Sequence, residues 1–333
     1  MSAMSCSFRT RLGWIGLPVI AGGAAIGVLV PSVSAQSYPA RPVRIVVGFA
    51  PGGSSDIAAR VMAQWLSERL GKQFVIENRA GTVSNIAAET VVRAPADGHT
   101  LLLVSSADTI NATLHPKPNF NFIRDIAPVA GMTQQPQVLW ANPAVPAATF
   151  SELIVYLKAN PGKLTIASAG NGSISHLAGD LLRTTVGVDL IHLPYRGSGP
   201  ALTDLLAGHV QVSFSGMAGS IQHAKSGRLR ALAVTTEKRS DALPDIPTIS
   251  EFFPGFSAVS LFGIGAARNT PAEIIEKLNS EINAGLADPK MQARFADLGG
   301  VVLAGSAAAF GKLLADETEK WEKVIRAGNI KAE

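Results

Sequence analysis

The stretch Val43-Arg44-Ile45-Val46-Val47, followed by Phe49-Ala50-Pro51-Gly52-Gly53-Ser54-Ser55-Asp56, decides the fold of this chain. The β-branched apolar run is typical of a buried strand, and the glycine turn after it leads into an amphipathic helix. Such a junction points several backbone N–H groups at one place, which suits a bound anion. No lysine follows the glycines, and their spacing is not that of a dinucleotide fingerprint, so neither kind of nucleotide loop is predicted.

Strands and helices alternate along the rest of the chain, which predicts right-handed βαβ units and parallel sheets. The predicted strands cover residues 45–47, 74–77, 101–104, 164–168, 191–193, 210–213, 229–234 and 261–266. The predicted helices cover residues 56–70, 85–93, 150–160, 174–185, 200–207, 220–226, 271–287, 289–298 and 306–326. Thr270 is the expected N-cap of the helix that begins with Pro271.

Two such α/β sets predict two lobes, with the chain crossing between them near residues 131–136 and again near 255–259. The predicted fold class is therefore α/β with a hinged two-lobe arrangement, in which a ligand closes the lobes together. We assign residues 36–133 and 258–333 to lobe 1, and residues 134–257 to lobe 2.

The N-terminus has the pattern of a secretory signal peptide, predicted to cover residues 1–35. Arg9 and Arg11 precede an apolar stretch, and Val33-Ser34-Ala35 supplies small residues before a cut ahead of Gln36. A membrane anchor is the alternative, but glycines and a proline interrupt the stretch. The single cysteine, Cys6, lies in this segment, so the mature chain is predicted to contain no disulfide and no cysteine nucleophile. These features predict a periplasmic location.

The charge balance argues against a nucleic-acid partner. The net charge of +4 falls to +2 without Arg9 and Arg11, and the remaining charges are dispersed. The histidines are scattered without metal-ligand spacing, so neither a metal site nor a cofactor is expected. The dispersed surface charge favours a monomer.

Three predicted strand-to-helix junctions share a Gly/Ser composition: residues 52–55, 168–173 and 197–199. One such loop is more simply a turn and a cap, but three at corresponding places favour a ligand site at the carboxyl ends of the strands. Arg196 either meets a ligand carboxylate or pairs with a surface acid. Asp56 is expected to order its loop. Ser173 and His176 are conceivable as a nucleophile and its base, although no G-x-S-x-G elbow is present, so capping or packing is favoured for His176.

The candidate ligand-binding residues lie on these junctions and on the loops beside them. They are Phe49, Pro51, Gly52, Gly53, Ser54, Ser84, Asn85, Ser105, Ser106, Ser168, Gly170, Asn171, Gly172, Ser173, His176, Tyr195, Arg196, Gly197, Ser215 and Met217. No catalytic residue is assigned.

Several segments together resemble the tripartite tricarboxylate transporter substrate-binding family, also called the Bug receptors, over residues 38–330. They are Tyr38-Pro39-Ala40-Arg41-Pro42, the 49–56 loop, Glu77-Asn78-Arg79, Ala96-Asp97-Gly98-His99, Ala159-Asn160-Pro161-Gly162, residues 168–173, His192-Leu193-Pro194-Tyr195-Arg196-Gly197, Leu229 to Thr235, and Leu243-Pro244-Asp245-Ile246-Pro247. Their order and spacing are specific in combination.

The resemblance implies a type II periplasmic binding protein fold of the Venus-flytrap kind, and a receptor rather than an enzyme. Such a receptor captures a small organic carboxylate through backbone N–H groups, hydroxyls and waters, and delivers it to membrane permease subunits. Two alternatives are an esterase-like hydrolase using Ser173 and His176, and a receptor that signals to a membrane sensor.

The chain departs from the family pattern in two places. Residues 80–86 read Ala-Gly-Thr-Val-Ser-Asn-Ile, where a glycine-rich stretch is usual, and Ser213-Phe214-Ser215-Gly216-Met217 lacks the usual acid. An amino-acid ligand would need an acid for its ammonium group. We therefore expect a di- or tricarboxylate, or an aromatic carboxylate, with Phe49 as an apolar wall.

Overall fold

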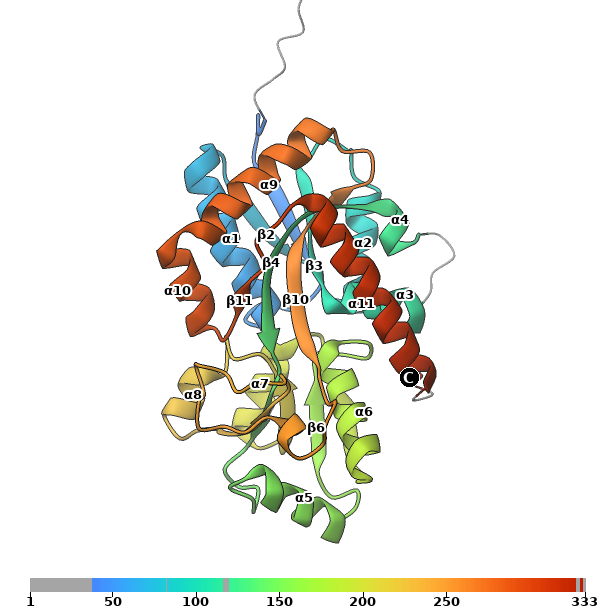
Figure 1. Cartoon of the computed structure of the whole chain (residues 1–333), viewed down its shortest axis with the longest axis vertical. Coiled ribbons are helices and arrows are strands. Elements are labelled where there is room, and N and C mark those ends of the chain that lie inside the picture. The colour runs from blue at the N-terminus through green and yellow to red at the C-terminus, as the bar shows by residue number, and fades with distance from the viewer. Residues whose placement is uncertain (1–37, 82, 116–119, 328–329, 332–333) are drawn as a thin grey trace, which may run out of the picture. The chain divides into compact units, whose positions relative to one another are not determined.

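The computed structural model describes residues 38–81, 83–115, 120–327 and 330–331. The predicted signal peptide, residues 1–35, lies outside these ranges. One compact unit spans Ser37–Glu333 and contains two β-sheets covered by helices (Figure 1). Within the described ranges, no helix has the length and apolar character needed to cross a membrane.

The first sheet has the strand order β11-β4-β10-β3-β1-β2. In that order the strands are Val301–Val302, Ile126–Pro136, Val259–Ala267, Thr100–Ser105, Val43–Val47 and Phe74–Asn78. β1 pairs in parallel with β2 and β3, as the alternation of strand and helix predicts. β10 runs antiparallel to β3 and β4. The accompanying helices are α1 (Ser54–Leu70), α2 (Asn85–Val92), α3 (Ser106–Leu114), α4 (Phe122–Asp125), α9 (Ala272–Ala287), α10 (Pro289–Asp297) and α11 (Ala307–Ala327).

The second sheet has the order β7-β6-β8-β5-β9. Its strands are Ile191–Pro194, Thr165–Ser168, Val212–Ser215, Val138–Ala141 and Arg230–Val234. β6 is parallel to β7 and β8, while β5 is antiparallel to β8 and β9. Its helices are α5 (Phe150–Ala159), α6 (Ile174–Val186), α7 (Ser198–Ala207) and α8 (Ile221–Lys225), with a 3₁₀ turn at Ile249–Glu251.

The sequence pattern misses five helices and strands, namely α3, α4, β4, β5 and β11, and the 3₁₀ turn. The second half of β4 contains Gly131, Thr133, Gln134, Gln135 and Pro136, a composition typical of a linker. Tertiary pairing overrides that local preference, because β4 lies beside β10 along its whole length. β8 also begins two residues later than predicted, which places Ser215 at the end of the strand.

The chain passes between the two sheets twice. β4 ends at Pro136 and β5 begins at Val138, so the first passage is at Gln137; the return lies between β9 and β10. Figure 1 shows β4 and β10 running side by side from the first sheet toward the second. The predicted lobe boundary between residues 133 and 134 falls inside β4, and the division of the chain into lobes stays a prediction.

The inner strands β3 and β10 of the first sheet and β5 and β8 of the second are buried on both faces, because helices cover both sides of each sheet. One face of the first sheet packs through residues such as Ile45, Ile264 and Phe295 against α1, α9 and α10. The opposite face packs through Val46 against α2 and α11. In the second sheet the larger core cluster includes α5 and α6, and residues of α3 and α11 join it.

Candidate functional site

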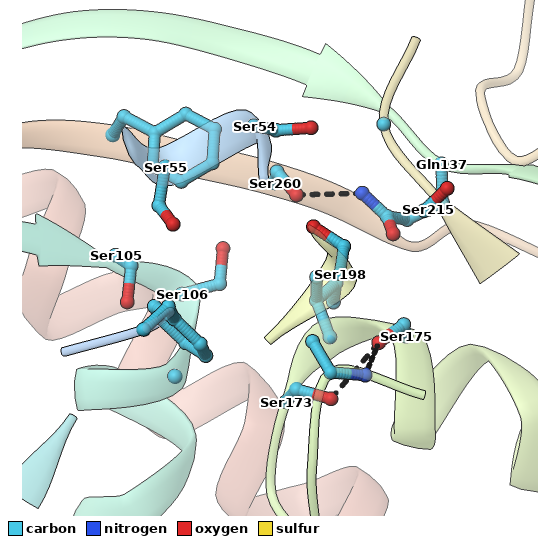
Figure 2. A pocket seen from close by; sticks show the side chains of 16 residues that line it. Ser54, Ser55, Ser105, Ser106, Gln137, Ser173, Ser175, Ser198, Ser215 and Ser260 are labelled. Carbon is cyan, nitrogen blue, oxygen red and sulfur yellow. Dashed lines mark hydrogen bonds between the residues drawn. The ribbon is translucent and has the colours of Figure 1, made fainter. Parts of the chain in front are cut away.

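A pocket lined by serines lies where strand ends of the two sheets face each other. Its empty volume is about 440 Å³, part of which is open to solvent. Phe49, Phe262 and Ile174 supply apolar walls, and Gln137 is the only polar side chain besides the serines among the described lining residues. None of the described lining residues carries a charge. The serines, all labelled in Figure 2, are Ser54, Ser55, Ser105, Ser106, Ser173, Ser175, Ser198, Ser215 and Ser260.

The first wall is the β1–α1 junction. Gly53 is the N-cap of α1 without a side-chain cap, so the first N–H groups of the helix have no partner within the helix. Asp56 accepts hydrogen bonds from Gly52 N at 3.1 Å, from Asn78 Nδ2 at 2.9 Å and from Arg60. Burial acts to raise the pKa of Asp56, but these hydrogen bonds outweigh it and hold the pKa below its usual value. Asp56 therefore orders the loop, as expected from the sequence, while the hydroxyls of Ser54 and Ser55 line the pocket.

The second wall is the start of α3, where Ser105 and Asp108 form a reciprocal capping box. Ser105 N donates to Asp108 Oδ2 at 2.7 Å, and Ser84 Oγ donates to Asp108 Oδ1 at 2.7 Å. Burial raises the pKa of Asp108 to about 6, against the opposing effect of these hydrogen bonds. Asp108 is thus a buried carboxyl group that is separated from the pocket by the hydroxyl of Ser105. The sequence pattern did not single it out.

The third wall is the β6–α6 junction, where Ser173 is the N-cap of α6. Its Oγ accepts from His176 N at 3.2 Å and lies 2.9 Å from Ser175 Oγ, which accepts from Ala169 N (Figure 2). His176 Nδ1 accepts from Gly172 N at 3.1 Å, and His176 Nε2 lies 3.3 Å from Asp180 Oδ2. Both ring nitrogens are therefore directed at groups other than the Ser173 hydroxyl. This geometry is that of a cap, and it does not pair a nucleophile with a base.

The passages between the sheets complete the pocket. Gln137 Nε2 donates to Ser260 Oγ at 2.7 Å, and these two residues join the first passage to β10. Neither was predicted, because a lone glutamine between two strands and a lone serine within a strand carry no local signal for a site. Ser55, Ser175 and Ser198 were also missed, although Ser55 and Ser198 lie in the Gly/Ser junctions that the sequence highlights and Ser175 lies two residues beyond one of them.

The structure distributes the sequence-predicted residues over several places. Phe49, Ser54, Ser105, Ser106, Ser173 and Ser215 line the serine pocket. Ser84, Ser168, Gly172 and His176 lie behind its loops, where Ser168 Oγ lies 2.7 Å from His192 Nε2. Asn85 and Met217 are buried outside the lining. Pro51, Gly52, Gly53 and Gly197 lie where the two junctions touch: a Cβ on Gly53 would lie 2.5 Å from Ser198 Oγ.

The remaining predicted residues, Gly170, Asn171, Tyr195 and Arg196, line a second chamber, whose empty volume of about 660 Å³ includes space open to solvent. Phe49 and Ala169 belong to the linings of both the serine pocket and this chamber. Val83 also lines this chamber. Its φ angle is 39°, and the φ angle of the next residue, Ser84, is 72°. Non-glycine residues rarely adopt such angles, and these two stand where the sequence departs from a glycine-rich pattern. Asn111 Nδ2 donates to Val83 O, which holds the turn.

The described lining of the serine pocket offers hydroxyl and backbone N–H donors and no cation. Neutral donors in a partly enclosed site suit a carboxylate, since hydrogen bonds to an ionised acceptor are stronger than neutral ones. Among the described residues, no group of three or more His, Cys, Asp or Glu side chains is placed to hold a metal ion.

Comparison with known proteins agrees with this geometry. Residues 58–330 match the model of the tripartite tricarboxylate transporter family receptor. A Pseudomonas sp. protein encoded in the tcbD-tcbE intergenic region is 38% identical, over 93% of this chain and 94% of its own. The protein BugT of Bordetella pertussis is 36% identical, over 92% of this chain and 95% of its own.

Three solved structures are similar throughout. An R. palustris protein solved with adipate has a TM-score of 0.86 at 34% identity, covering 88% of this chain and 99% of its own. The periplasmic binding protein BugD has a TM-score of 0.85 at 34% identity, covering 89% and 100%. MatC from Rhodopseudomonas palustris, solved with malate, has a TM-score of 0.82 at 32% identity, covering 86% and 100%.

These matches confirm the predicted two-lobe periplasmic binding protein fold, and they imply a periplasmic location. Solute-binding receptors are not a class of enzyme. The chain belongs to the tripartite tricarboxylate transporter family of receptors.

Proposed function

We propose that this receptor captures a small organic carboxylate in the serine pocket and delivers it to the membrane permease subunits of a tripartite tricarboxylate-type transporter. The observation that carries the proposal is that the described lining has nine serines and one glutamine and no charged group. Relatives of this fold solved with adipate and with malate support it. Phe49, Ser54, Ser105, Ser106, Ser173 and Ser215 are the sequence-predicted residues that we propose as ligand contacts.

The hydroxyls of Ser54, Ser55 and Ser198 are the best placed donors. None of the three hydroxyls bonds to another residue within the described ranges, so each is available to a ligand oxygen. Ser54 and Ser55 come from the start of α1, whose dipole also favours a negative charge. Ser198 comes from the start of α7, a helix that accompanies the second sheet. A ligand held by all three hydroxyls would therefore bridge the two sheets.

The pocket chemistry also limits the class of acid. An α-amino acid would bring an ammonium group, which needs an acceptor of negative charge. The described lining has no carboxylate, and the buried Asp108 is occupied by Ser84 and Ser105. Phe49 and Phe262 instead supply flat apolar surface for an aromatic ring or a methylene chain. We therefore propose di-, tri- or aromatic carboxylates as ligands rather than acidic amino acids.

Isothermal titration calorimetry of the mature protein against these acids tests the proposal. Ser54→Ala is expected to weaken carboxylate binding about tenfold or more, because a hydrogen bond to a charged group is lost. The exposed Ser226→Ala, whose hydroxyl bonds only to His223 O, is the matched control and should leave the affinity unchanged. Binding of aspartate or glutamate without binding of any di-, tri- or aromatic carboxylate would contradict the proposed ligand class.

Delivery and export need separate tests. Uptake of a labelled carboxylate by cells that express the permease should require this receptor, and equal uptake without it would refute delivery. We propose that residues 1–35 are a signal peptide, so the exported protein should begin at Gln36, and N-terminal sequencing of the periplasmic fraction tests this.

A further inference from the structure

The second chamber adjoins the serine pocket but differs from it in charge. Its lining includes Arg196 and His115 and contains no acidic side chain in the described ranges. Because Phe49 and Ala169 belong to both linings, these two residues form a common wall between the adjacent spaces. A space with neutral donors therefore adjoins one with a cationic lining.

Arg196 is fixed at its main chain while its side chain is left available. Its carbonyl accepts from Ala50 N at 2.9 Å, across the gap between the β1 and β7 loops. The residue is exposed, and its guanidinium makes no hydrogen bond or ion pair within the part of the chain that the structure describes. The neighbouring acid is occupied elsewhere: Asp204 accepts from the Tyr195 hydroxyl at 2.6 Å and lies 3.4 Å from His209 Nδ1. Arg196 therefore does not pair with a surface acid in the described part of the chain, which was one of the two alternatives from the sequence.

The other walls suit the body of an organic acid. Phe49, Val83, Ala169 and Pro194 are apolar, and the ring of Tyr195 adds flat surface because its hydroxyl is committed to Asp204. His115 Nε2 lies 3.3 Å from Asn171 O, which links the end of α3 to the β6–α6 loop across the chamber. A chain of methylene groups or a ring would lie between these surfaces with its far end at Arg196.

We propose that the second chamber is an anion subsite, and that the receptor takes elongated dicarboxylates that occupy both spaces at once. One carboxylate binds to the serine hydroxyls, the apolar body passes Phe49, and the second carboxylate pairs with the Arg196 guanidinium. A guanidinium binds a carboxylate through two parallel hydrogen bonds, which favours Arg over a simple positive charge. This inference rests on the proposed carboxylate function and adds the length and charge of the ligand.

Calorimetry with matched acids tests the inference. The probes are succinate, adipate, suberate and sebacate, each paired with the linear monocarboxylate of the same number of carbons. The proteins are the mature wild type, Arg196→Gln, Arg196→Lys, and the control Arg228→Gln, which removes an exposed arginine that lines neither space. Thermal unfolding checks that every variant is folded.

Arg196→Gln should bind dicarboxylates above a threshold length about tenfold or more weakly than the wild type does. Its affinity for monocarboxylates should fall by less than twofold. Arg196→Lys should recover part of the loss, and Arg228→Gln should match the wild type. An equal effect of Arg196→Gln on mono- and dicarboxylates, or no effect on either, would overturn the second subsite but leave the serine pocket intact. Failure of the wild type to bind any of the acids would overturn the proposed function, and this inference with it.

Discussion

Asp108 shows how a single buried residue sets the properties of the pocket. It is 3% exposed, and its oxygens accept from Ser84 and from both the backbone and the hydroxyl of Ser105. An ionised carboxyl therefore takes the Ser105 proton away from the pocket and places a negative charge behind it. Protonation of Asp108 reverses both effects.

We predict a dependence of stability on pH that is specific to Asp108. Burial raises the pKa of Asp108 to about 6, so the folded protein binds this proton more tightly than the unfolded chain. Its contribution to stability is fully present below pH 4 and is lost as the pH rises through 6. Asp108→Asn keeps the acceptor for Ser105 N but cannot titrate.

Urea unfolding of the wild type and Asp108→Asn at pH 5 and 7.5 measures this effect. The free energy of unfolding of the wild type, relative to the variant, should be about 1 kcal/mol greater at pH 5 than at pH 7.5. Parallel stability profiles for the two proteins would show that Asp108 does not titrate in this window.

Packing between helices, rather than helix signals in the sequence, decides several features of the elements. Thr270 was expected to cap α9, but its hydroxyl donates to Ala267 O, and the N-cap is Pro271, one residue later. Gly285 lies inside α9, where glycine is locally unfavourable, because Trp65 of α1 occupies the space beside it. Trp65 Nε1 also donates to Glu281 O at 2.9 Å, which ties α1 to α9.

Two helical glycines should respond to alanine in opposite directions. A Cβ on Gly285 would lie 2.8 Å from Trp65 Nε1, so Gly285→Ala should destabilise the protein by about 1–3 kcal/mol through overpacking. A Cβ on Gly179 in α6 would meet only Ile166 Cδ1, at 3.4 Å. Gly179→Ala should therefore stabilise by about 0.5–1 kcal/mol, the helix-propensity difference. Chemical denaturation of the two variants measures the change in the free energy of unfolding of each. Equal changes in the two variants would refute the packing explanation.

The two sheets meet in the structure through their junction loops as well as through the connecting strands. Ala50 N donates to Arg196 O, and a Cβ on Gly199 would lie only 2.3 Å from Pro51 O. Because the serine pocket takes residues from both sheets, its geometry depends on this close approach. We propose that ligand binding favours the arrangement in which these loops touch.

Gly199→Ala is expected to weaken carboxylate binding at least tenfold without loss of folding. The added methyl group meets a backbone oxygen that no side-chain rotation can move, so the loops must separate. Calorimetry gives the affinity, with Gly179→Ala as a helical glycine control remote from the contact. Small-angle scattering should also show that the radius of gyration of the wild type decreases when ligand is added. An unchanged affinity in Gly199→Ala, or unchanged scattering at saturation, would contradict ligand-linked closure.

Local patterns in the sequence were sufficient to predict most of the elements and the fold class. Apolar runs such as 43–47 and the glycines that follow them act within a few residues, so strand, turn and helix can be inferred without knowing the neighbours. Six of the predicted residues line the serine pocket, and each lies at or beside the end of a strand or the start of a helix. The absence of a charged residue next to Ser215 was also visible in the sequence.

Tertiary structure alone decided how these residues are combined. β4 is a strand only because β10 pairs with it, and that pairing brings Gln137 to Ser260, 123 positions away. The sequence placed Arg196 among the candidates for one site, while the fold puts it in an adjoining chamber beyond Phe49. The physical reason is that strand order and burial depend on contacts between distant segments, whereas turns and periodicity depend on neighbours in the chain. The kind of site was thus encoded locally, and its shape, its buried acid and its second chamber arose from packing.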